Sequence, residues 1–500
     1  MKNWNVRKTI VAREDMPEHH RLSQTLSWPH LIALGVGAIV GTGILTLTGV
    51  GAAKAGPAVI LSFAIAGVIC AAAALAYAEM ATMYPASGSA YTYTYVVMGE
   101  LLAWIVGWSL ILEYSLVVSA VAVGWSGYAA PLLVEAANFP TWLTHGPVLE
   151  GTLGEGTLRL AEFGINVPAI FIIAVIAGLL IYGVRESANL NAMLVVVKIL
   201  ALIVFVAVTL PYFDAANFEP FSPYGFGKQT IVGPDGVPVE VGVMAAAAII
   251  FFAFYGFDAI ATAAEETKKP ERDLAIGIVG SMLLCVAIYM AVAGTAIGAL
   301  AYTRFANSPE PLALILRELG QPWVARYLAI SAVIALPTVI LAFFYGQSRI
   351  FFVMARDGLL PEGLARVSGR GSPVRITLFT AVIVALLAGV IPLADLAALA
   401  NAGTLTAFAF VGACMLVMRR RAPDLPRRFR TPLPWLIGAI AVLGCAYLFY
   451  NLPRTTQIYF LVAHIIGLAI YFFYGGPRAE RARAVTTESL AVPSEAGTIQ

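Results

Sequence analysis

Long apolar stretches of about 20 residues, the length of helix that spans a lipid bilayer, dominate the chain. We predict an all-α integral membrane protein with 12 transmembrane helices, at residues 28–50, 58–83, 98–130, 166–184, 190–212, 241–265, 275–300, 324–354, 374–391, 394–418, 434–452 and 456–475. Only the turn at Ile391-Pro392-Leu393 separates the ninth and tenth stretches, so eleven helices is the alternative. The membrane domain is thus expected at 28–475, between an N-terminal segment at 1–27 and a polar tail at 476–500 that we predict to be disordered.

The composition agrees with this class. The chain is 60% hydrophobic and only 12% charged, whereas soluble domains carry about 25% charged residues. Lipid must therefore cover much of the apolar surface. The net charge of +2 argues against a nucleic-acid partner. The four cysteines lie far apart in apolar segments, so we expect free thiols and no metal site. The polar N-terminus does not resemble a cleaved signal peptide.

Most lysines and arginines outside the apolar segments fall on the side of the membrane that carries the N-terminus. Cytoplasmic loops are enriched in these residues, so we predict that both termini are cytoplasmic. The arginine-rich stretch from Arg419 to Arg430 is interpreted as an orientation signal and not as a nucleic-acid site.

Glycines interrupt two of the predicted helices. The first segment contains Gly35-Val36-Gly37-Ala38-Ile39-Val40-Gly41-Thr42-Gly43, and the sixth contains Tyr255-Gly256-Phe257-Asp258. A helix that unwinds at mid-depth must line a cavity or be buried in protein. Interrupted helices at corresponding positions in two halves indicate a transport site and an inverted repeat. The alternative for Gly37 and Gly41 alone is a helix-packing motif; the second interruption favours a binding site.

Four further motifs, together with the glycine run, resemble the amino acid–polyamine–organocation (APC) superfamily, in its bacterial cationic-amino-acid-transporter-like branch. They are the predicted loop from Tyr84 to Tyr93, Phe251 to Glu266, Tyr345 to Pro361, and Arg428-Phe429-Arg430-Thr431-Pro432. The resemblance implies a LeuT-like fold in the bacterial inner membrane. Ten core helices form a 5+5 inverted repeat with helices 1 and 6 discontinuous, and two C-terminal helices follow. It also implies amino acid transport, usually driven by the proton gradient.

A zwitterionic amino acid needs donors for its carboxylate and acceptors for its ammonium. The N–H groups freed around Gly41, Thr42 and Gly43 lie at the start of a half-helix, where positive partial charge collects. The carbonyls that we expect to accept from the ammonium are those near Ile39, Val40, Phe252, Ala253 and Tyr255.

Ionisable residues inside a membrane are costly and usually functional. Glu113 lies in the middle of the third segment, and we predict a role in the substrate pocket or in proton coupling; a protonated or paired structural group is the alternative. Asp258 follows the second interruption, and we predict a pocket or gating role, against a helix-packing partner. Glu79 is expected to be an internal gate or packing partner. Glu265 and Glu266 are expected in solvated or gating ion pairs.

Lys198 is the only charged residue in the apolar run from Ala192 to Ala201. It lies about 13 Å of helical rise beyond Asn189, which is deep for a lysine that snorkels to the surface. Burial disfavours the charged form of an amine, so a lysine at this depth can load and lose a proton. Proton-coupled transporters that this chain resembles have a lysine on the fifth helix. We therefore predict that protonated Lys198 bridges to the unwound first helix and serves in proton coupling.

The resemblance also places Phe343 at the side-chain pocket, where cationic transporters tend to have a small residue. A phenylalanine shortens the pocket, so we predict small or medium neutral amino acids as substrates. A cationic amino acid is the alternative, because Glu113 and Asp258 could pair with its charge.

We thus predict a secondary active transporter that imports L-amino acids by proton symport, with alternating access around a midplane site. An amino acid/amine exchanger and a non-transporting amino acid sensor are the alternatives. The expected partners are the substrate, protons and membrane lipid; an additional small accessory membrane subunit is left open. No cofactor is expected, and the scattered histidines argue against an enzyme or a metal site.

Overall fold

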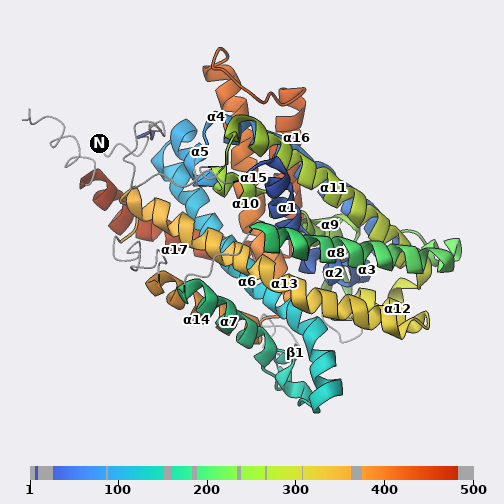
Figure 1. Cartoon of the computed structure of the whole chain (residues 1–500). Helices are drawn as coiled ribbons and strands as arrows, with labels where there is room; N and C mark the ends of the chain where they lie inside the picture. Colours follow the sequence, from blue (N-terminus) through green and yellow to red (C-terminus); the bar gives the residue numbers. More distant parts are fainter. Residues whose placement is uncertain are drawn as a thin grey trace, which may run out of the picture.

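Long α-helices make up most of the computed structural model of the chain (Figure 1). It describes residues 6–8, 26–85, 88–150, 159–182, 188–233, 238–264, 267–306, 308–361 and 374–481. The α-helices are α1 (Trp28–Ile39), α2 (Thr42–Leu45), α3 (Leu47–Ala55), α4 (Val59–Met83), α5 (Ser89–Met98), α6 (Glu100–Ala137), α7 (Val167–Tyr182), α8 (Ala188–Thr209), α9 (Val243–Ile250), α10 (Asp258–Thr262), α11 (Pro270–Ala299), α12 (Pro311–Glu318), α13 (Pro322–Arg356), α14 (Val374–Val390), α15 (Leu393–Arg421), α16 (Pro434–Asn451) and α17 (Arg454–Ile470).

Two short antiparallel hairpins connect helices. β1 (Val148–Glu150) pairs with β2 (Arg159–Glu162), and β3 (Gln229–Val232) pairs with β4 (Pro238–Val241). In the second hairpin Gln229 lies opposite Val241 and Val232 lies opposite Pro238.

Nine helical spans in the described part of the chain are long and apolar enough to cross a membrane. Three shorter apolar helices, α1, α7 and α14, coincide with the first, fourth and ninth predicted segments. The protein is therefore an all-α, multi-pass membrane protein.

The structure differs from the sequence prediction at three places. The motif from Tyr84 to Tyr93 is predicted as a loop, but α5 begins within it at Ser89, and the tyrosines of α5 are buried. The two hairpins were not predicted. Helical backbone continues to Arg481, beyond the predicted boundary at 475, and residues 482–500 lie outside the described residues, as do Glu265 and Glu266.

The interrupted helices lie inside the bundle. In Figure 1, α1, α2 and α10 lie within a surround formed by α4, α6, α11, α13 and α15, and α7 and α14 lie side by side at the edge. The apolar window in Val243–Thr262 is 94% buried, whereas that in Asn191–Tyr212 is only 33% buried. The second interruption is thus shielded from lipid on all sides.

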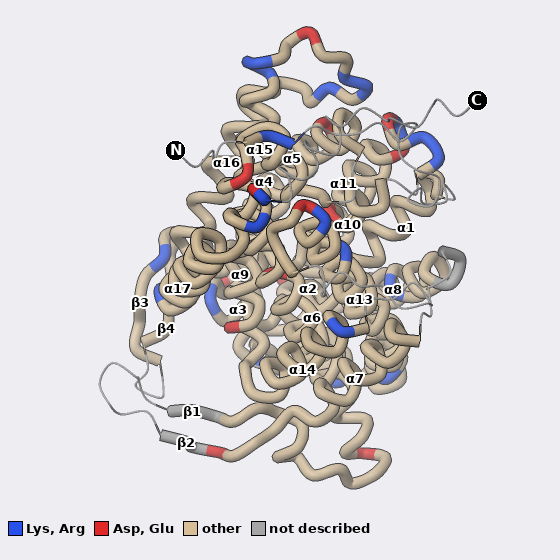
Figure 2. The backbone as a smooth tube through the Cα atoms, turned by 90° about the vertical axis from the view of Figure 1, so that its left-hand side faces the viewer, with Lys and Arg blue, Asp and Glu red and all other residues tan. Residues whose placement is uncertain are grey.

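An ion-pair network joins α4 to the connection between α15 and α16. Figure 2 shows basic positions clustered on this connection. Glu79, which has no exposed surface, pairs with Arg419 (2.6 Å) and Arg427 (3.2 Å) and accepts a hydrogen bond from the N–H of Thr431 (2.9 Å). Glu79 therefore holds the last helices of the chain against the core.

We expect Glu79→Gln to lower the free energy of unfolding by about 3 kcal/mol or more, because removing one partner leaves buried guanidinium charge without its counter-charge. Thermal unfolding in detergent measures this. The control is Glu271→Gln, which breaks an exposed pair with Arg428 and should cost less than about 1 kcal/mol. Equal melting temperatures for the two variants would contradict the assignment.

The N-terminal segment contacts the same end of the bundle. Lys8 pairs with Asp357, just after α13 (2.7 Å), and the Tyr91 hydroxyl donates to the same carboxylate (2.9 Å). The N–H of Glu100, at the start of α6, donates to the carbonyl of Val6 (3.0 Å). The first described residues therefore link α5, α6 and α13.

Candidate substrate and coupling site

The first interruption separates α1 from α2. Helix α1 ends at Ile39 and α2 begins at Thr42. Between them Val40 has extended backbone and Gly41 is not helical. The first N–H groups of a helix and the last carbonyls of the preceding one lack intrahelical partners. The carbonyl of Ile39 accepts a hydrogen bond from the Tyr289 hydroxyl (2.8 Å), and a second lone pair remains on this oxygen.

The second interruption separates α9 from α10. Helix α9 ends at Ile250, a 3-10 turn covers Phe251–Ala253, and α10 begins at Asp258. Gly256 has φ +119°, a conformation that side chains rarely adopt, and a Cβ there would lie 2.9 Å from the carbonyl carbon of Ala38. The position therefore requires glycine for both its backbone angle and its contact.

The two interrupted segments touch each other. A Cβ added to Gly43 would overlap the Cα of Ala253. The first turn of α2 and the 3-10 turn of the second interruption are therefore in direct contact, and a side chain at residue 43 would separate them.

A small pocket lies where the two interruptions meet. Backbone and side chains of both interruptions line it together with α6 and α13: Ala38, Ile39, Gly41, Thr42, Gly43, Val117, Val121, Phe252, Tyr255, Val339 and Phe343. We call this the central pocket. No charged side chain of the described residues is among its lining. The pocket thus offers backbone polar groups on one side and apolar walls on the other.

The predicted substrate-binding residues divide into three groups. Seven line the central pocket: Ile39, Gly41, Thr42, Gly43, Phe252, Tyr255 and Phe343. Val40 lines a neighbouring pocket, and Ala253 packs on Gly43. Glu113 and Asp258 are fully buried but lie outside the lining of the central pocket.

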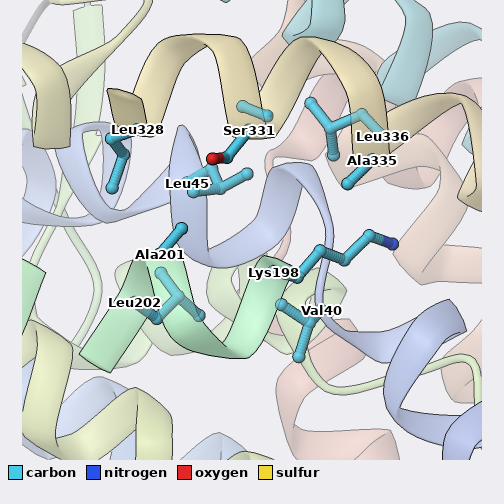
Figure 3. A pocket seen from close by; sticks show the side chains of 10 residues that line it. Val40, Leu45, Lys198, Ala201, Leu202, Leu328, Ser331, Ala335 and Leu336 are labelled. Atoms are coloured by element: carbon cyan, nitrogen blue, oxygen red, sulfur yellow. The ribbon is translucent and has the colours of Figure 1, made fainter. Parts of the chain in front are cut away.

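Lys198 joins three helices. Its Nζ donates to the carbonyl of Gly37 on α1 (2.9 Å) and to Oγ1 of Thr338 on α13 (3.1 Å). The side chain is 5% exposed. Figure 3 shows it extending from α8 past Val40, with its stem on the wall of the neighbouring pocket. Thr338 carried no sequence signal of its own, because hydroxyls are common in membrane helices.

Aromatic rings separate the two carboxyl groups from the central pocket. The Phe343 ring packs against those of Tyr114 and Tyr255, with centroids 5.3 and 5.6 Å apart. The Tyr114 hydroxyl donates to Oδ2 of Asp258 (2.8 Å). We call Tyr114, Tyr255 and Phe343 the aromatic layer.

Comparison with known proteins shows the family of the chain. The model of the amino acid permease family matches residues 26–471. The chain belongs to this family, within the APC superfamily. It is 44% identical to the branched-chain amino acid permease BcaP of Bacillus subtilis, over 89% of this chain and 91% of that protein. It is 38% identical to the methylthioribose transporter of the same species, over 94% and 97%. It is 35% identical to the vacuolar cationic amino acid transporter 2 of Arabidopsis thaliana, over 86% and 64%. These relatives are transporters and not enzymes.

Asn401 supports the second interruption of this permease, and the sequence analysis missed it. Its Nδ2, on α15, donates to the carbonyls of Ala248 (2.8 Å) and Ile249 (2.9 Å) at the end of α9. This buried amide thus supplies a side-chain donor to two of the last carbonyls of α9. The available signal was an asparagine in the middle of an apolar segment.

We expect Asn401→Ala to lower the free energy of unfolding of the permease by about 1–3 kcal/mol, because two buried carbonyls lose their donor. Thermal unfolding in detergent tests this, and substrate binding should weaken in parallel as the interruption loosens. Thr406→Val is the matched control, since the Thr406 hydroxyl lies on the same helix and donates to the Ala402 carbonyl one turn earlier (2.8 Å). A larger loss for Thr406→Val would contradict the role of Asn401.

Proposed function

We propose that this permease imports neutral L-amino acids with apolar side chains by proton symport. The site lies at the midplane and opens alternately to either side of a bacterial plasma membrane. The proposal includes a 12-helix, LeuT-like inverted repeat with both termini in the cytoplasm. The observation that carries it is the central pocket, with unwound backbone on one side and apolar walls on the other.

The common part of the substrate binds the interrupted helices. Its carboxylate accepts from N–H groups around Gly41, Thr42 and Gly43, and its ammonium donates to carbonyls around Ile39 and Phe252. Val40, Ala253 and Tyr255 supply further backbone groups of the same two segments. This arrangement recognises the backbone of any amino acid.

The side chain of the substrate is selected by the remaining walls. Val117, Val121, Val339 and Phe343 line the pocket and have apolar side chains. A charged side chain would lose its hydration there without a partner, whereas a branched aliphatic side chain gains burial. The name of the 44% identical relative, a branched-chain amino acid permease, supports this class.

Lys198 couples the proton to the first helix. A charged ammonium makes stronger hydrogen bonds than a neutral amine, so protonation tightens the link from α8 to Gly37 and Thr338. Loss of the proton weakens that link and frees α1 to move. Glu113 and Asp258 lie outside the lining of the central pocket, so a neutral apolar substrate bound there does not depend on them.

Uptake into proteoliposomes tests the function. We expect leucine, isoleucine and valine to accumulate in empty vesicles when the outside is acidic, and arginine to compete poorly. Methylthioribose belongs in the panel because a relative is named for it. Counterflow without uptake into empty vesicles would indicate an exchanger. Saturable binding without any flux would indicate a sensor.

A further inference from the structure

The two carboxyl groups beneath the aromatic layer form one unit, although they are far apart in sequence. Glu113 on α6 and Asp258 on α10 are both fully buried. Tyr114, the residue after Glu113, donates its hydroxyl hydrogen to Oδ2 of Asp258 (2.8 Å), so α6 and α10 are in contact at this pair. Helix α15 presses on Glu113, since a Cβ on Gly403 would lie 3.0 Å from the Glu113 Cβ. Little room for solvent therefore remains between α15 and Glu113.

Neither carboxyl group has a basic partner among the described residues. Lys198 on α8 donates to the Gly37 carbonyl, and Arg349 on α13 donates to the Thr262 carbonyl (3.3 Å). The other titratable groups near the two carboxyl groups are four phenols and one thiol, none of which carries a positive charge. They are Cys70, Tyr77, Tyr93, Tyr114 and Tyr255. Two buried like charges without a counter-charge are strongly unfavourable.

The hydrogen bonds of the pair are incomplete. Both oxygens of Glu113 and Oδ1 of Asp258 lack a partner in the described part of the chain. The Thr404 hydroxyl beside Glu113 donates to the Ala400 carbonyl (3.2 Å). The fully buried hydroxyl of Tyr255 is also without a partner there, and its electrostatic neighbours are these two carboxyls. A proton on one of the two carboxyl groups would add a hydrogen-bond donor to this group of acceptors.

We infer that Glu113 and Asp258 are a proton-binding pair, holding one carboxylic acid beside one carboxylate while the aromatic layer is closed. The site is separate from Lys198, because Lys198 lies on another helix and donates to other groups. Opening of the aromatic layer exposes the pair and lets the proton exchange with water. The Tyr114 hydroxyl bond to Asp258 marks the carboxylate, and the acid proton resides on Glu113.

Infrared difference spectroscopy of the full chain reconstituted in lipid tests the pair. We expect a carbonyl-stretch band of one buried carboxylic acid at neutral pH, which shifts in heavy water. Glu113→Gln and Asp258→Asn should each remove it. Glu135→Gln is the matched control, because this carboxylate pairs with Arg326 at the surface and is 63% exposed; the band should persist.

The outcomes are distinct. A band that neither variant removes, or no band at any pH, would overturn the pair. A band that appears only after sodium and potassium are removed would also overturn it, since a metal cation would then occupy the site. If Glu113→Gln does not fold, Asp258→Asn and the pH titration of the wild type decide. Lys198→Met should leave the band intact, so a permease that proves not to be a symporter would still show it.

Discussion

Replacing Lys198 with methionine is expected to abolish concentrative uptake driven by a proton gradient, while counterflow exchange continues. Methionine has nearly the same length but cannot donate to Gly37 or Thr338. The Thr338 hydroxyl keeps its own bond to the Ala335 carbonyl (2.7 Å), so α13 should stay intact. Uptake of leucine into proteoliposomes with an acidic exterior measures the effect, and the final internal concentration should fall to the external one.

Two further variants sharpen this result. Lys198→Arg keeps the charge but cannot release its proton, so it should also exchange without accumulating substrate. Lys228→Met removes a lysine that pairs with Glu240 outside the bundle interior (3.4 Å) and should accumulate leucine normally. Wild-type accumulation by Lys198→Met would remove this residue from the coupling mechanism.

Phe343→Ser is expected to admit cationic amino acids and to weaken binding of branched aliphatic ones by roughly tenfold or more. The serine removes the ring that packs on Tyr114 and Tyr255, which opens the central pocket toward Glu113 and Asp258. A positively charged side chain then finds a counter-charge, while an aliphatic side chain loses contacts. Competition by arginine and lysine against leucine counterflow measures both changes.

The same helix supplies the control. Phe352→Ser removes a ring that is 39% exposed and contacts Arg356, and selectivity should not change. Adding Glu113→Gln to Phe343→Ser should cancel the gained arginine binding. If arginine still competes in the double variant, the acidic pair is not what attracts it.

The membrane class and the two interruptions follow from local features of the sequence. An apolar stretch long enough to cross the hydrocarbon layer can be recognised from the sequence alone. Glycine indicates where a helix can unwind, because it has no side chain to clash. Both observed interruptions lie at such glycines, before Thr42 and around Gly256. Lys198 could be identified for a similar reason, since a single charged residue in an apolar segment stands out without any knowledge of the tertiary structure.

The structure of the segment before α5 and of the two hairpins was harder to predict from the sequence. Pro85 and Gly88 indicate a turn, but the tyrosines after them are buried against other helices, and that burial stabilises α5. Both hairpins are short, and the strands β3 and β4 of the second are mostly exposed, so their few residues carry no strong alternation.

The amino-acid sequence was sufficient to place this chain among multi-pass permeases with unwound backbone at Gly41 and Gly256, because those features depend on residues adjacent in the chain. The packing of helices alone brings Asn401 to the end of α9, Tyr289 to Ile39 and Glu113 to Asp258. Such partners lie more than a hundred residues apart. Which side chains face each other depends on how each helix is rotated about its axis, and the local composition does not determine that rotation.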